Sequence, residues 1–169
     1  FETVVQKIPK GTGDAVKKAS NSLKKFTGVI LVCFGDTPFL TAETFKRVIK
    51  AFDNETKLVI TGFKKFEKNN YGKIIFSSKN KPIEIVEQKD AELRNIHSEF
   101  CNGGVMAIHS SVISQLNKIQ ENLISREYYL TDLVKVLNNE KKKISFIEIK
   151  EEEIIGINNQ VDLSVAEKI

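Results

Sequence analysis

The sequence is poor in several residue types, and each shortage narrows the class of protein. Arginine occurs only at Arg47, Arg94 and Arg126, and the lysines are scattered among acidic residues, leaving a formal net charge of +4. Nucleic-acid-binding surfaces usually concentrate basic residues on one face, with arginines that contact phosphates and base edges. We therefore expect no nucleic-acid partner.

Cysteines and long apolar runs are also scarce. Cys33 and Cys101 each lie in a strand-like apolar run without a CxxC partner, and His97 and His109 do not complete a zinc set. We expect two buried free thiols in a reducing compartment. The longest apolar run, residues 29–34, is too short to cross a bilayer, and no signal peptide is visible. We therefore expect a cytoplasmic chain without a membrane partner.

Methionine occurs once, at Met106, so Phe1 is not an unprocessed translational start, and we expect a fragment or a processed product. The 169 residues, 41% of them hydrophobic, suffice for one core and not for two. No solenoid-type repeat and no Pro/Gly/Ser-rich linker divides the chain. Residues 1–169 are therefore predicted to form a single domain.

Strand-like and helix-like patterns alternate along the chain. Strands are predicted at 29–34, 58–61, 73–76, 83–87, 104–108 and 144–149, and helices at 14–23, about 45–52, 110–119 and about 131–138. The second helix is expected to bury Phe45, Val48, Ile49 and Phe52, and Ser110 or Ser111 is expected to cap the third. The turn-rich tract 77–81 predicts a β-hairpin. The pattern indicates an α/β fold with a mixed, mostly parallel sheet and helices on its faces.

Asp36 follows the most apolar predicted strand, directly after Gly35. In open α/β sheets ligands bind beyond the carboxyl ends of the strands. A carboxylate there suits Mg²⁺, which prefers one or two protein oxygens together with phosphate and water. The same aspartate could equally organise the turn before Pro38, and both interpretations stay open on the residues alone.

Other polar groups are weaker candidates. Gly11-Thr12-Gly13 precedes a helix, so its amides could face an anion or a base edge. Two glycines before a helix, however, usually indicate only a tight turn into that helix. The amide of Gln6 offers the donor and acceptor that the imide edge of uracil requires. Glu87, Asn102, Asn158 and the segment 127–132 are each typical of turns or caps when considered singly.

Together these pieces resemble a known family, the uridylyltransferase domain of the bacterial bifunctional N-acetylglucosamine-1-phosphate uridyltransferase/glucosamine-1-phosphate acetyltransferase. The resemblance rests on seven segments in the family's order that cover nearly the whole chain. They are Gln6 with Gly11-Thr12-Gly13, Phe34-Gly35-Asp36-Thr37-Pro38, Asn70-Tyr71-Gly72-Lys73-Ile74, residues 85–91, Cys101-Asn102-Gly103-Gly104-Val105-Met106, Glu127-Tyr128-Tyr129-Leu130-Thr131-Asp132 and Gly156-Ile157-Asn158-Asn159.

The resemblance implies a role for each matching position. It implies a Rossmann-like, glycosyltransferase-A-like nucleotidyltransferase fold that transfers uridylyl from UTP to N-acetylglucosamine 1-phosphate with Mg²⁺ as cofactor. Nucleotide-binding positions are Gln6, Gly11, Thr12, Phe34, Gly35 and Asp36; sugar-binding positions are Gly72, Glu87, Asn102, Tyr129 and Thr131; the catalytic metal ligands are Asp36 and Asn158. The family more often has tyrosine where this chain has Phe34.

Two parts of the family pattern have no counterpart in the sequence. Nothing before Gln6 supplies the glycine-rich loop that holds the UTP phosphates, and the C-terminal acetyltransferase β-helix, which builds the family's homotrimer, is absent. We therefore expect an N-terminally truncated domain with unpaired strand edges, poorly active alone, from a homotrimeric parent. A nucleotidyltransferase for another sugar phosphate and a non-catalytic nucleotide-sugar-binding domain stay as alternatives.

Overall fold

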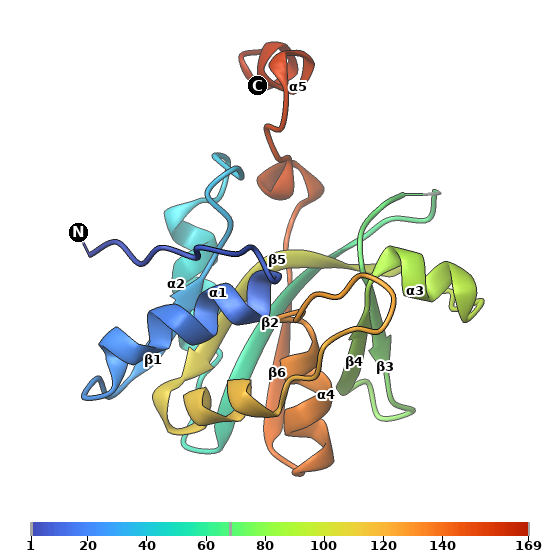
Figure 1. Ribbon diagram of the computed structural model, residues 1–169. Coiled ribbons are helices and arrows are strands. Elements are labelled where there is room, and N and C mark those ends of the chain that lie inside the picture. The colour runs from blue at the N-terminus through green and yellow to red at the C-terminus, as the bar shows by residue number, and fades with distance from the viewer. Residues whose placement is uncertain (1, 68, 169) are drawn as a thin grey trace.

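The computed structural model describes residues 2–67 and 69–168. Its centre is a six-stranded sheet in the order β4-β3-β5-β2-β6, with β1 also paired to β5 (Figure 1). The strands are β1 (Val29–Val32), β2 (Thr56–Lys64), β3 (Lys73–Phe76), β4 (Pro82–Val86), β5 (Phe100–His109) and β6 (Lys143–Glu148).

The sheet is mixed, as predicted. Strand β5 runs antiparallel to β1, β2 and β3, β4 runs antiparallel to β3, and β2 pairs in parallel with β6. Strands β1, β2, β3 and β6 therefore point one way, and β4 and β5 the other. The β3–β4 hairpin is confirmed. Most strands share one direction, but most pairings are antiparallel because β5 lies between strands of that direction.

The two edges of β5 are used differently. Strand β2 pairs along one edge, whereas the other edge pairs with β3 at Cys101 and with β1 from Met106 to His109. The stretch from Asn102 to Val105 lies between these two partners. It forms an opening in the sheet that the candidate site uses.

Helices cover both faces of the sheet (Figure 1). The helices are α1 (Thr12–Ala19), α2 (Ala42–Lys50), α3 (Gln88–Leu93), α4 (Asp132–Asn139) and α5 (Gln160–Ala166), of which α5 projects away from the sheet; the 3₁₀ turns are η1 (Ser20–Leu23), η2 (Ser110–Lys118) and η3 (Glu151–Ile154). Side chains alternate along the buried strands, so Leu58 and Ile60 pack with α4 and η2, while Val59 packs with Val48 of α2. Within the described residues, no helix is long and apolar enough to span a bilayer.

Three local predictions are wrong. Cys33 is exposed, because β1 ends at Val32 and the chain has left the sheet; Cys101 is buried as expected. Ile49 is 48% exposed, because only one narrow stripe of α2 faces the sheet. His109, and neither serine, is the N-cap of η2, with its Nδ1 accepting from the Ser111 amide at 3.2 Å.

Candidate active site

A cavity of about 510 Å³ opens beside the unpaired stretch of β5. It is bounded by the segment after β1, the start of β3, the residue after β4 and the segment before α4. Nine of the predicted site residues line it: Gln6, Gly11, Thr12, Phe34, Gly72, Glu87, Asn102, Tyr129 and Thr131. Residues more than 120 positions apart in the sequence thus meet around one space. Its volume is within the usual range for small-molecule sites.

The loop before α1 is held against residues 128–130 by backbone contacts. The Gly13 amide donates to the Tyr128 carbonyl at 2.8 Å, the Tyr128 amide donates to the Lys10 carbonyl at 2.8 Å, and the Leu130 amide donates to Thr12 Oγ1 at 3.0 Å. Gly11 has φ +94°, and a Cβ there would lie 2.6 Å from the Tyr128 carbonyl oxygen. Only glycine permits this approach. The predicted uracil and sugar positions are therefore parts of one connected wall.

Gln6 is oriented by a residue that the sequence reasoning missed. Its Nε2 donates to Asp14 Oδ2 at 2.6 Å and to the Gly11 carbonyl at 3.2 Å. The hydrogen bonds from Lys18 and Gln6 hold the pKa of Asp14 below its ordinary value. The available signal was an acidic residue in the first turn of a helix, which usually indicates no more than a favourable interaction with the helix dipole.

The predicted sugar positions converge on Glu87. Thr131 Oγ1 donates to Glu87 Oε1 at 2.7 Å, and a Cβ on Gly72 would lie 3.3 Å from Glu87 Oε2. Burial raises the pKa of Glu87, the Thr131 hydrogen bond opposes that rise, and the nearby carboxylates Asp90 and Glu127 add to it. A half-buried carboxylate with a fixed hydroxyl partner is suited to accept hydrogen bonds from sugar hydroxyls.

Asn102 belongs to the opening along β5, and Phe34 packs against it. The Asn102 amide donates to the Gly72 carbonyl at 2.8 Å, while Asn102 Oδ1 accepts from the Gly104 amide at 3.2 Å. Gly104 has φ +72°, and a Cβ there would lie 2.9 Å from Cδ2 of Phe34, so the ring packs directly on the strand. The glycine pair in a strand pattern was the signal for such a close approach.

Asp36 and Asn158 are 122 positions apart in the sequence and come together in the structure. The Ile157 amide donates to the Asp36 carbonyl at 2.8 Å. A Cβ placed on Gly156 would lie 3.3 Å from Asn158 Nδ2 and 3.6 Å from Asp36 Oδ2, so both side chains flank the same glycine. Neither side chain lines the 510 Å³ cavity itself, although Phe34 and Thr37, on either side of Asp36, do.

The donor groups at this position suit a hard divalent cation. Both side chains are exposed, and they offer a carboxylate and an amide, whose oxygen and nitrogen exchange by a half rotation. In the part of the chain that the structure describes, this position included, no group of three or more His, Cys, Asp or Glu could hold a metal. Two protein ligands with water or phosphate completing the shell is the arrangement typical of Mg²⁺.

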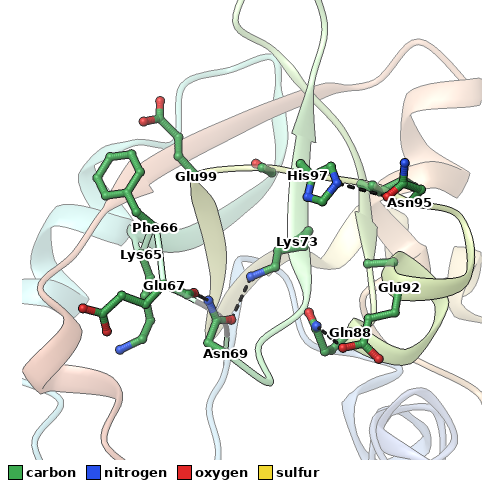
Figure 2. A pocket seen from close by; sticks show the side chains of 13 residues that line it. Lys65, Phe66, Glu67, Asn69, Lys73, Gln88, Glu92, Asn95, His97 and Glu99 are labelled. Atoms are coloured by element: carbon green, nitrogen blue, oxygen red, sulfur yellow. Dashed lines mark hydrogen bonds between the residues drawn. The ribbon is translucent and has the colours of Figure 1, made fainter.

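A second cavity, of about 770 Å³, contains none of the predicted residues (Figure 2). Lys73 projects into it, and its ammonium donates to Asn69 Oδ1 at 2.7 Å and to the buried Cys101 Sγ at 3.2 Å. Both acidic side chains, such as Glu67, Glu92 and Glu99, and the basic side chains of Lys65 and Lys73 line it. The segment from Asn69 to Lys73 separates it from the smaller cavity.

The fold and the site together define an α/β protein with a ligand-sized cavity beside the opening along β5. The Nucleotidyl transferase family model matches residues 1–152, and the chain belongs to that family. Among curated relatives, it is 38% identical to the "Bifunctional protein GlmU" of Ruegeria sp. over 98% of this chain and 37% of that protein. It is 36% identical to the protein of the same name from Bartonella bacilliformis, over 97% of this chain and 36% of that one.

A solved structure supports the fold. The chain superposes on the nucleoside-diphosphate-sugar pyrophosphorylase from Vibrio cholerae RC9 with a TM-score of 0.70 at 15% identity, covering 98% of this chain and 68% of that one. The chain thus spans little more than a third of the length of the curated relatives it matches.

Proposed function

We propose that this chain forms the uridylyl-transfer site of an enzyme that makes UDP-N-acetylglucosamine and pyrophosphate from UTP and N-acetylglucosamine 1-phosphate. The observation that carries the proposal is the proximity of Asp36 and Asn158 beside the cavity that collects the predicted nucleotide and sugar residues. Family membership and the relatives named GlmU support the same reaction class.

Each wall of the cavity has a distinct task in this proposal. Gln6, whose nitrogen donates to Asp14 and to the Gly11 carbonyl, presents its amide oxygen to the N–H of the uracil edge, and Gly11 and Thr12 support the base. Glu87, Asn102 and Thr131 accept or donate hydrogen bonds to the sugar, and Tyr129 covers it. The sugar phosphate oxygen then attacks the α-phosphorus of UTP in line, and pyrophosphate leaves with the electron pair of the broken bond.

The chain's contribution to the rate is positioning and charge neutralisation, because phosphoryl-type transfer needs little covalent work from the protein. Asp36 and Asn158 would hold Mg²⁺, which supplies the charge neutralisation that lets two anionic phosphates approach. No general base is required, since a sugar phosphate is already an anionic nucleophile. The cytoplasmic location and the homotrimer of the longer parent stay predictions.

Replacing the proposed metal ligand tests the function directly. In the longest protein that the gene encodes, Asp36→Ala is expected to lower pyrophosphate release from UTP and N-acetylglucosamine 1-phosphate by roughly 100-fold or more, because metal stabilisation is worth several kcal/mol. Asp36 is exposed, so the unfolding midpoint should stay close to that of the parent. Wild-type turnover by the variant at ordinary Mg²⁺ concentrations would overturn the assignment.

Two further measurements separate the alternatives. Comparing pyrophosphate release with glucose 1-phosphate, glucosamine 1-phosphate and N-acetylglucosamine 1-phosphate identifies the sugar. Binding of UDP-N-acetylglucosamine without pyrophosphate release in the same protein would instead indicate a non-catalytic binding domain.

A further inference from the structure

One buried carboxylate connects the two loops that carry Asp36 and Asn158. Glu153, in the short turn η3, is 8% exposed and is the one buried carboxylate among the residues that the structure describes. Its Oε2 accepts from Thr41 Oγ1 at 3.2 Å and from Thr44 Oγ1, and its Oε1 accepts from the Lys150 amide at 3.4 Å. A side chain of one loop is thus fixed to the helix that follows the other.

The partners of Glu153 belong to the start of α2. Thr41 is the N-cap of that helix, and its Oγ1 accepts from the Thr44 amide at 3.1 Å. A helix N-terminus carries a partial positive charge that favours a carboxylate. Burial acts to raise the pKa of Glu153, but the hydrogen bonds from Thr44, Lys150 and Thr41 outweigh it and hold that pKa below its ordinary value. The carboxylate is therefore ionised and fully engaged.

These contacts connect the loop that carries Asp36 and the loop that carries Asn158 at two places. Thr41 lies five residues after Asp36, and Asn158 lies five residues after Glu153. At the base, Glu153 bonds Thr41 and Thr44; at the tip, the Ile157 amide donates to the Asp36 carbonyl at 2.8 Å. Hydrogen bonds thus connect the two loops at both ends. The distance between the Asp36 and Asn158 side chains therefore depends on both sets of hydrogen bonds.

We propose that Glu153 is a positioning residue that sets the spacing of Asp36 and Asn158 and thereby the affinity of the site for a divalent cation. This inference rests on the proposed function, because it takes those two side chains as the metal ligands. The hydrogen bonds of Glu153 go to Thr41, Thr44 and Lys150, and none of them involves the side chain of Asp36 or Asn158. It acts by holding both loops in one geometry, since metal affinity falls when ligands must be reorganised on binding.

The competing explanation is that Glu153 only stabilises the start of α2. That role predicts a loss of folding stability in Glu153 variants with unchanged metal affinity of the folded protein. A control with the same chemistry at a distant place distinguishes the two roles, and the chain offers one in Asp53.

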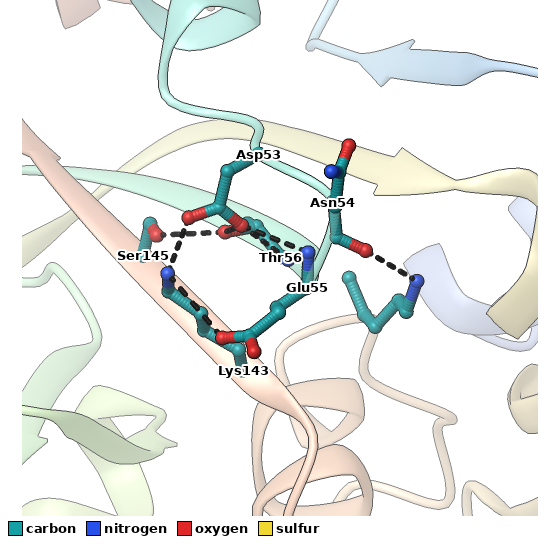
Figure 3. Close-up of polar contacts among 7 residues, drawn as sticks. Asp53, Asn54, Glu55, Thr56, Lys143 and Ser145 are labelled. Atoms are coloured by element: carbon teal, nitrogen blue, oxygen red, sulfur yellow. Dashed lines mark hydrogen bonds and ion pairs between the residues drawn. The ribbon is translucent and has the colours of Figure 1, made fainter.

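Asp53 is a carboxylate in the turn between α2 and β2 (Figure 3). Its Oδ1 accepts from Thr56 Oγ1 at 2.8 Å, from the Thr56 amide at 2.8 Å and from the Glu55 amide at 3.0 Å, and its Oδ2 pairs with Lys143. Because β1 and β2 point the same way, this turn before β2 lies at the opposite end of the sheet from Asp36. Thr44 and Thr56 are both buried, at 2% and 0% exposure, and each donates to its carboxylate.

The matched experiment compares Thr44→Val with Thr56→Val, and Glu153→Ala with Asp53→Ala, in the 169-residue chain. The affinity for Mn²⁺ in the presence of UTP is measured by electron paramagnetic resonance, and exchange of the Ile157 amide by hydrogen-exchange mass spectrometry. We expect Thr44→Val and Glu153→Ala to weaken Mn²⁺ binding about tenfold and to accelerate Ile157 exchange. Glu153→Gln should recover part of the affinity, because its amide oxygen can still accept from both threonines.

The control variants are expected to keep the parental Mn²⁺ affinity and Ile157 exchange even where their unfolding midpoint falls. Equal effects of the two threonine variants, or none from either, would overturn the positioning role. Asp36→Asn is measured alongside. If it loses Mn²⁺ while Glu153→Ala retains it, the proposed metal site stands and only the present inference fails. If Asp36→Asn binds as the parent does, the metal site fails and the inference fails with it.

Discussion

Two predicted site glycines differ in what surrounds them. Gly11 has a positive φ and lies against the backbone of Tyr128, where a Cβ would come within 2.6 Å of the carbonyl oxygen. Gly35, next to Asp36, has no heavy atom within 4 Å of the place where its Cβ would lie. The first glycine is required by the fold, whereas the second leaves open space beside the proposed metal ligand.

This difference predicts opposite results for the same substitution. Gly11→Ala should destabilise the chain by at least about 2 kcal/mol, because a strained backbone and a steric overlap both add cost. Gly35→Ala should change stability by less than about 0.5 kcal/mol, as surface substitutions do. Its methyl group should nevertheless weaken UTP binding about tenfold by occupying the space expected for the nucleotide. Urea unfolding and calorimetric UTP titration measure both effects; unchanged UTP affinity in Gly35→Ala would contradict the assignment of that glycine.

Gln6 offers a second test at the residue scale. Its amide nitrogen is engaged by Asp14, so the orientation of the group is set before any base binds. Gln6→Ala should lower the preference for UTP over CTP by about tenfold or more, because a matched amide discriminates by leaving polar groups of the wrong base unpaired. Asp14→Asn keeps the Gln6 amide but removes its charged acceptor, so it should lower the preference for UTP over CTP less. Competition binding of the two nucleotides measures the ratio, and an unchanged ratio in Gln6→Ala excludes a base-reading role.

At the scale of elements, the N-cap residue of α4 uses its side chain in the candidate site and does not cap the helix. Thr131 occupies the N-cap, yet its hydroxyl donates to Glu87 and makes no cap hydrogen bond. Asp132 follows in the first turn. Burial raises the pKa of Asp132 to about 6; Lys135 acts against this rise, and Glu87, Glu84 and Asp90 add to it. Ionisation of Asp132 at the start of α4 is therefore less favourable in the folded state than in the unfolded chain.

The raised pKa has a defined consequence for stability. The folded state holds the Asp132 proton up to about pH 6, whereas the unfolded chain releases it near pH 4, so stability falls as pH rises between these values. Asp132→Asn should therefore be more stable than the parent at pH 8, by on the order of 1–3 kcal/mol. This advantage should shrink toward pH 4.5. Urea unfolding at both pH values measures the difference, and an equal effect at both would show that ionisation of Asp132 is not its cause.

Elements were predictable where the pattern is local. The strand at 73–76 has the predicted bounds and the hairpin after it forms, with its second strand one residue earlier than predicted, because alternation and a turn-rich tract depend on neighbouring residues. The helix around 45–52 formed as expected, but the apolar pattern wrongly predicted that Ile49 is buried. The exposure of Cys33 was missed because an apolar run does not reveal where hydrogen bonding to the next strand stops.

At the scale of the whole molecule, the chain is unevenly stabilised. Strand β2 is paired on both sides, and Leu58, Val59 and Ile60 have no exposed surface. Helix α5 lies at the other extreme: it projects away from the sheet, with Val161 72% exposed (Figure 1). Local opening should therefore differ greatly between these elements.

Native-state hydrogen exchange should follow this order. Amides of β2 are expected to exchange slowest, at rates set by global unfolding, and those of α5 fastest, because few packed contacts oppose its opening. Nuclear magnetic resonance of the chain in deuterated buffer measures the rates residue by residue. Protection of α5 equal to that of β2 would contradict this picture.

The amino-acid sequence by itself determined the alternation of strands and helices, the hairpin, the glycine positions and the types of polar residue that could serve a nucleotidyltransferase. These features depend on side chains a few positions apart, whose periodicity and turn chemistry are visible in one dimension. Only the tertiary structure decided that Asp36 and Asn158 flank Gly156, that Thr131 contacts Glu87 and that Glu153 joins α2 to η3. Those encounters depend on strand order and on the opening along β5, which are set by the packing of the whole sheet and its helices.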